Sequence, residues 1–148
     1  MSVDNNIKIV DWSNSISVHK VNGLYVLDNP VYIIFEYNYT KIKITVDKGA
    51  MTDGLSVPKI FRWYLPDWDK DNVLYNVAGI VHDGAYGSEL LAKDIADELF
   101  YQGLVMAGIS KSKATVAKYA VQYLAGLHYG REHDDFGISE YVSLMCIN

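Results

Sequence analysis

Residues 72–86, NVLYNVAGIVHDGAY, decide how the rest of the chain is interpreted. The residues that recur in this stretch at i, i+3, i+4, i+7, i+8 and i+11 are Leu74, Val77, Ala78, Val81, His82 and Ala85. This spacing is the stripe of a helix with one buried face. The pattern therefore predicts a helix from about Asn72 to Tyr86, with His82 facing inward.

The residues before this helix are typical of β-strands. From Ile7 to about Val46 the chain is rich in Val, Ile, Tyr and Thr, in short runs broken by turn residues. The predicted strands are Ile7–Trp12, Leu24–Leu27, Val31–Tyr37 and Lys41–Val46. Asn22-Gly23 fits a tight hairpin turn. An antiparallel meander is the simplest topology.

Two more helices are predicted after residue 86. One runs from about Leu91 to Ala107, has Asp97 among apolar neighbours, and ends at Gly108. The other begins at a cap formed by Ser110 or Ser112 and ends at Gly130. A last apolar segment, Tyr141–Ile147, is interpreted as a strand.

These elements predict an α+β fold in which an N-terminal antiparallel sheet precedes a three-helix C-terminal part. The length of 148 residues favours one domain, 1–148. Within it, residues 1–47 are mainly β, 48–71 form a motif loop, 72–130 are mainly α, and 131–148 form a tail.

Composition excludes several classes of protein. Thirteen Lys and Arg against 18 Asp and Glu give a net charge of −5, so nucleic acid is not an expected partner. No apolar run approaches the roughly 18 residues of a membrane span, and no secretory signal precedes residue 20. A single cysteine, Cys146, forms no internal disulfide, which favours a reducing compartment.

The pair His82-Asp83, with Tyr86 one turn later, is the most informative group for chemistry. A histidine held between an orienting carboxylate and a water molecule is a common general base. Asp97, on the next helix, is the candidate orienting carboxylate, and Asp83 is then available for a hard cation. The alternative is a hydrogen-bonded core histidine with Asp83 facing solvent.

The loop 51–58, MTDGLSVP, precedes the His82 helix and has two interpretations. It is either a site loop lying against His82 or simply the connection to the next helix. The first interpretation predicts that Asp53 lies close to His82 or Asp83.

Four motifs in order resemble a family of small phage and prophage proteins known only as a domain of unknown function. They are TDGLSVP (52–58), VHDGAY (81–86), ADELF (96–100) and YAVQYLAGLHYG (119–130). The resemblance covers about Lys48 to Gly130 and implies a bacteriophage origin. The protein would then be made in the host cytoplasm, and one alternative is its incorporation into the virion.

A more distant resemblance, over about Ile80 to Gly130, is to the His-Asp helix core of phospholipase A2. It implies that His82 is the water-activating base, Asp83 a calcium ligand, Tyr86 a support and Asp97 the orienting carboxylate. The glycine-rich calcium loop of that superfamily has no counterpart here, and Asp53 with its loop would have to substitute for it.

Two functions from different classes remain open. The first is a metal-assisted hydrolase, such as an esterase or phospholipase, with a divalent cation, most simply calcium, and a lipid substrate. The second is a non-catalytic module of the virion or tail that binds other phage virion proteins. A third alternative is an inhibitor of host defence that binds a host factor. The hydrolase interpretation predicts that His82 and Asp97 approach within about 2.6–3.2 Å.

Overall fold

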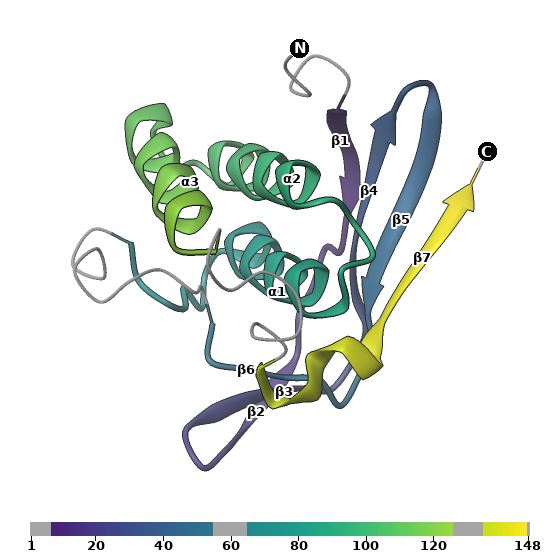
Figure 1. Cartoon of the computed structure of the whole chain (residues 1–148). Helices are drawn as coiled ribbons and strands as arrows, with labels where there is room; N and C mark the ends of the chain where they lie inside the picture. The colour runs from purple at the N-terminus through teal and green to yellow at the C-terminus, as the bar shows by residue number, and fades with distance from the viewer. Residues whose placement is uncertain (1–6, 55–64, 126–134, 148) are drawn as a thin grey trace.

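The computed structural model describes residues 7–54, 65–125 and 135–147, and Figure 1 shows how their elements are arranged. The elements are, in chain order, β1 (Ile7–Trp12), β2 (Val18–Val21), β3 (Leu24–Leu27), β4 (Val31–Tyr37), β5 (Thr40–Val46), β6 (Met51–Thr52), α1 (Val73–Ser88), α2 (Lys93–Met106), α3 (Lys111–Ala125), the 3₁₀ helix η4 (Asp135–Tyr141) and β7 (Val142–Ile147). The α+β prediction is confirmed. The predicted helix end at Gly130 and the loop residues 55–58 lie outside the described residues.

The predicted meander is wrong. Among the described strands, β1, β4, β5 and β7 form one antiparallel sheet in that order, and β2, β3 and β6 form another. The Leu24–Leu27 strand pairs with β2 and β6 and not with β1, whose partner is β4. The interruption at Asp28-Asn29-Pro30 explains this, because proline supplies no donor and lets the chain leave one sheet before it enters the next.

The elements β2, β6 and η4 were not predicted, because their residues follow no helix or strand pattern. β2 has only a half-buried Val18 followed by three exposed residues, so its side chains do not alternate between core and solvent. β6 has two residues, and η4 is a short 3₁₀ segment. The predicted hairpin turn is confirmed, because both Asn22 and Gly23 have positive φ, as a type I′ turn requires.

Helices α1 and α2 lie side by side against one face of the four-stranded sheet (Figure 1). The main core lies between these layers; its fully buried members include Val31, Ile33, Phe35, Ile44, Val77, Ile80 and Leu99. Helix α3 packs on α2 around a second cluster that contains Phe100, Leu104, Ala114 and Ala117. The α1–α2 pair is therefore held from both sides.

Two glycines set how closely the elements approach. A Cβ on Gly103 would lie 2.9 Å from the Ala78 Cβ, so the missing side chain lets α2 approach α1. A Cβ on Gly84 would lie 2.9 Å from Val142 and 3.1 Å from Val46, which places α1 close to β5 and β7. The glycine of the VHDGAY motif is thus explained by packing.

The helix ends follow local capping rules. The Asn72 side chain accepts from the Tyr75 N–H at 3.2 Å and donates to the Ala107 carbonyl at 2.8 Å, so one residue caps α1 and ties it to the end of α2. Gly108, with φ of 99°, follows the end of α2. The Ser110 hydroxyl accepts from the Lys113 N–H at 3.3 Å, which settles the choice between Ser110 and Ser112.

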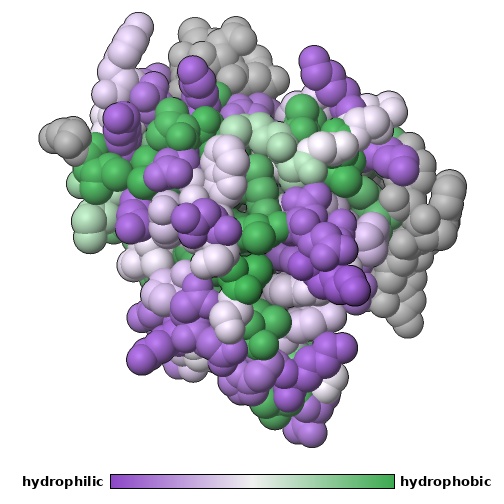
Figure 2. All heavy atoms as spheres, turned by 180° about the vertical axis from the view of Figure 1, so that it is seen from behind, coloured by the Kyte–Doolittle hydropathy of each residue, from purple (hydrophilic) through white to green (hydrophobic). Residues whose placement is uncertain are grey.

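The back of the molecule mixes both kinds of side chain. Figure 2 shows a band of hydrophobic residues running down this face, bordered by hydrophilic ones. Within the described part of the chain, none of the helices combines the length and hydropathy of a membrane span.

Candidate functional site

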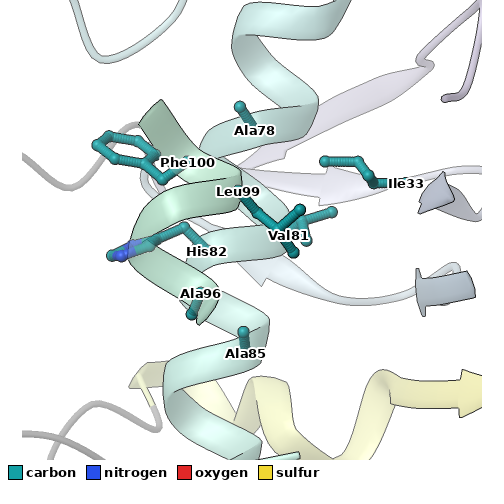
Figure 3. Close-up of a pocket in the computed structure, with 8 residues that line it drawn as sticks. All are labelled: Ile33, Ala78, Val81, His82, Ala85, Ala96, Leu99 and Phe100. Atoms are coloured by element: carbon teal, nitrogen blue, oxygen red, sulfur yellow. The ribbon is translucent and has the colours of Figure 1, made fainter. Parts of the chain in front are cut away.

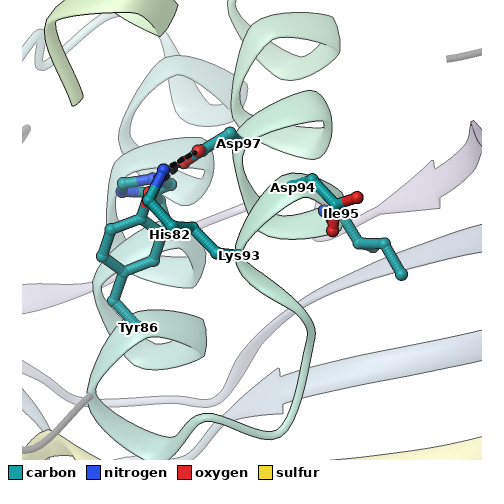
Figure 4. Close-up of polar contacts among 6 residues, drawn as sticks. All are labelled: His82, Tyr86, Lys93, Asp94, Ile95 and Asp97. Atoms are coloured by element: carbon teal, nitrogen blue, oxygen red, sulfur yellow. Dashed lines mark hydrogen bonds and ion pairs between the residues drawn. The ribbon is translucent and has the colours of Figure 1, made fainter. Parts of the chain in front are cut away.

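The predicted contact between His82 and Asp97 is confirmed. His82 lies on α1 and Asp97 on α2, and the imidazole Nε2 is 3.0 Å from the carboxylate Oδ1 (Figure 4). Both side chains are buried. Helical phase turns each residue toward the neighbouring helix, and the close approach at Gly103 brings the two helices together.

Asp97 is the centre of this cluster. Its Oδ1 also accepts from the Tyr86 hydroxyl, and its Oδ2 accepts from the Lys93 ammonium at 3.2 Å. Asp97 is 0% exposed and Lys93 is 30% exposed, so the lysine connects the buried carboxylate to the surface. Three donors surround one carboxylate, as a buried charge requires.

The environment of Asp97 keeps it ionised. Burial alone would raise the pKa of Asp97, but hydrogen bonds from His82 and Tyr86 and the charge of Lys93 lower it below the ordinary value of 3.8. An ionised carboxylate only accepts hydrogen bonds. His82 therefore carries a hydrogen on Nε2, and in the neutral imidazole Nδ1 has the free electron pair.

Aromatic rings fix the orientation of the imidazole. The centroid of the His82 ring lies 4.2 Å from that of Tyr86 and 4.6 Å from that of Phe100. Figure 3 shows His82 and Phe100 on one side of the helix pair and Ile33 and Val81 on the other. These residues line a void that is too small to hold a water molecule.

Two further predicted site residues are Asp83 and Asp53. Asp83 is half-buried on α1, and Asp53 is exposed just after β6. Asp94 is exposed in the first turn of α2 and points away from His82 (Figure 4). The expected closeness of Asp53 to His82 or Asp83 stays a prediction. Among the residues that the structure describes, no three His, Cys, Asp or Glu side chains form a group that could hold a metal ion.

Lys93 and Phe100 also belong to the site, although neither was predicted there. Lys93 precedes Asp97 by four positions on the same helix, a spacing that pairs opposite charges, so this contact could have been found. Phe100 reaches His82 from the other helix, and its helical phase alone could not distinguish this contact from ordinary core packing.

The fold and the site together define an α+β protein with a buried His–Asp–Tyr cluster between two helices that pack on an antiparallel sheet. A family model described as "Protein of unknown function (DUF1353)" matches residues 31–121, about three fifths of the chain, and the chain belongs to this family. The match runs from β4 into α3 and includes the whole His82–Asp97 cluster. No curated protein and no solved structure matches the chain.

Proposed function

We propose that this protein is a hydrolase of carboxylic esters in which His82 activates water. The observation that carries the proposal is the 3.0 Å contact between His82 Nε2 and Asp97 Oδ1, with Tyr86 donating to the same carboxylate. The arrangement orients the imidazole and directs its second nitrogen, Nδ1, to accept a proton. It also agrees with the residue roles implied by the resemblance to phospholipase A2, which favours a lipid ester as substrate.

The proposed reaction uses the cluster as an acid–base unit. His82 Nδ1 removes a proton from water while the water oxygen attacks the ester carbonyl carbon. Ionised Asp97 stabilises the resulting imidazolium. When the ester C–O bond breaks, the imidazolium returns its proton to the departing alkoxide, so the enzyme is regenerated. Tyr86 and Lys93 keep Asp97 charged and in place.

A calcium ion was expected at Asp83 and Asp53. Calcium takes six to eight oxygen ligands, and the described residues bring no group of three acidic or histidine side chains together. The steps above do not depend on a metal, and Asp83 and Asp53 stay the proposed calcium ligands. The calcium dependence of the protein is a separate question that a binding experiment answers.

The motif resemblance to phage and prophage proteins supports a bacteriophage origin. Under this proposal the protein acts on an ester of the infected cell, or on one that the virion meets. A role as an inhibitor of a host defence has no separate support in the site.

A second function is favoured by a specific observation. His82, Tyr86 and Asp97 are only 5%, 2% and 0% exposed, and the void beside His82 does not admit water. Water activation requires a wider opening at His82. A closed polar network would instead fix the two helices of a non-catalytic virion or tail protein.

One variant separates the two functions. We would assay the purified protein against short-chain p-nitrophenyl esters and against phospholipid vesicles, using wild type, His82→Gln and the control His19→Gln. His19 is exposed on β2, and its Nδ1 lies 2.6 Å from Oδ1 of Asp28. A hydrolase predicts that His82→Gln, still folded by circular dichroism, lowers turnover by about 10²–10⁴-fold, whereas His19→Gln does not. Absence of hydrolysis by the wild type, or equal turnover of the two variants, contradicts the proposal.

A further inference from the structure

The two edges of the four-stranded sheet differ in their protection. β1 forms one edge and β7 the other (Figure 1). An open edge presents unpaired N–H and C=O groups that can pair with another strand. Whether an edge is blocked therefore decides whether it can be an interface.

The β1 edge is blocked in three ways. The Gln102 side chain on α2 donates to the Ile7 carbonyl at 2.8 Å and accepts from the Ile9 N–H at 3.2 Å, so it occupies the positions of a neighbouring strand. The strand carries charges at Lys8 and Asp11. Its register with β4 is also broken by a bulge between Ile9 and Asp11.

The β7 edge has none of the sequence devices that protect β1. Its six residues, VSLMCI, include no charge and no proline. Its pairing with β5 is regular from Val142 to Ile147, without a bulge. Met145 is 61% exposed in the middle of the strand. Natural edges with these properties are the ones that recruit another strand.

We propose that β7 is a dimer interface, at which it pairs antiparallel with β7 of a second copy of this chain. Directly opposed residues in such a pair lie on the same face of the sheet, so the residue at the two-fold axis lies opposite its own copy. Leu144 and Met145 are the middle residues of β7, so one of them lies at the axis when the two strands overlap fully. Because the strand is uncharged throughout, no register places like charges opposite each other. This matters in a chain with a net charge of −5, whose copies otherwise repel.

The protected β1 edge explains why assembly would stop at two copies. Pairing of β7 with β1 of another copy would leave new edges and continue into a fibre, but Gln102 and the bulge block β1. Pairing of β7 with itself consumes the only edge in the described part of this sheet that lacks such protection. The four-stranded sheets of the two copies then form one continuous sheet, with the helices of both copies on the same face.

Sedimentation equilibrium of the full chain in reducing buffer tests this interface, with matched lysine substitutions at the two edges. Val10 on β1 and Met145 on β7 are both exposed hydrophobic residues. Met145→Lys should weaken dimerisation at least tenfold, and Val10→Lys should leave it unchanged. A monomeric wild type at about 100 μM, far above a micromolar dissociation constant, overturns the proposal, as does a dimer that both variants preserve.

Cross-linking gives a second measurement that does not depend on the lysine variants folding. In a Cys146→Ser background, either Leu144→Cys or Met145→Cys should form an intermolecular disulfide on oxidation, because one of them lies at the axis. Val10→Cys in the same background should not. Failure of both β7 cysteines to cross-link overturns the proposal.

Discussion

The His82 Nε2 atom lies 3.0 Å from Asp97 Oδ1, although the two residues are fifteen positions apart and on different helices. Only four residues, 89–92, connect α1 to α2, so the helices must run antiparallel and side by side. Asn72 ties the start of α1 to the end of α2, and Gly103 lets the helices approach. The cluster is therefore a product of helix packing.

Asp97→Asn should change how stability depends on pH. Because the folded protein lowers the pKa of Asp97, its carboxylate contributes stability well above pH 3.8, and this is lost as the pH falls through the lower folded value. We expect the variant to be less stable than wild type at pH 7 by about 1–3 kcal/mol. The difference should shrink below pH 3.8, as measured by urea unfolding at several pH values. Parallel pH profiles for the two proteins would contradict the role assigned to Asp97.

Tyr86→Phe isolates the hydroxyl contact to Asp97. The ring and its packing against His82 remain, and only the hydrogen bond to the carboxylate is lost. We expect a loss of about 0.5–1.5 kcal/mol in the free energy of unfolding. Under the hydrolase proposal turnover should fall less than for His82→Gln, since the base itself remains. A variant as stable as wild type would show that this hydroxyl does not support the site.

Gly103→Ala should push the two helices apart. The new Cβ would lie 2.9 Å from the Ala78 Cβ, which requires a shift of one helix. Overpacking typically costs about 1–3 kcal/mol, which exceeds the roughly 1 kcal/mol that alanine gains in a helix. The double variant Ala78→Gly/Gly103→Ala removes the clash, so thermal unfolding should show a favourable coupling between the two changes. Simple additivity would mean that this contact does not set the helix separation.

Gly54→Ala tests the backbone contact of the TDG motif. Gly54 has φ of 97°, and an added Cβ would clash with the Asp67 carbonyl oxygen. Gly108, with a similar φ of 99° and nothing within 4 Å of an added Cβ, is a matched control. We expect Gly108→Ala to cost about 1–2 kcal/mol and Gly54→Ala clearly more, measured by urea unfolding. Equal losses would show that the loop can move away from Asp67.

Calcium should raise the melting temperature of the wild type if Asp83 is a ligand, because a ligand that binds only the folded state stabilises it. The expected result is a shift that EDTA reverses and that Asp83→Asn reduces, with the exposed Asp94→Asn as control. A shift of the same size in both variants, or no shift in the wild type, would exclude Asp83 as a calcium ligand.

Local pattern was sufficient for much of the fold. Runs of strand-forming residues between turns predicted β1, β3 and β4 at their observed bounds, and together with helical periodicity they placed α1, α2, β5 and β7 to within two residues. It also placed His82 and Asp97 on buried helix faces. These predictions worked because helix and strand geometry depends on neighbours a few residues apart, and the helix stripe repeats that geometry in the sequence.

The sequence by itself determined which segments are helices or strands, which faces are buried, and that His82 and Asp97 could meet. The tertiary structure alone decided that β1 pairs with β4, that Gln102 blocks the β1 edge, and that Phe100 packs on the His82 ring. The physical reason is the range of the interactions. Strand order and side-chain contacts between elements depend on how distant segments share one core, and no short stretch of sequence contains that information.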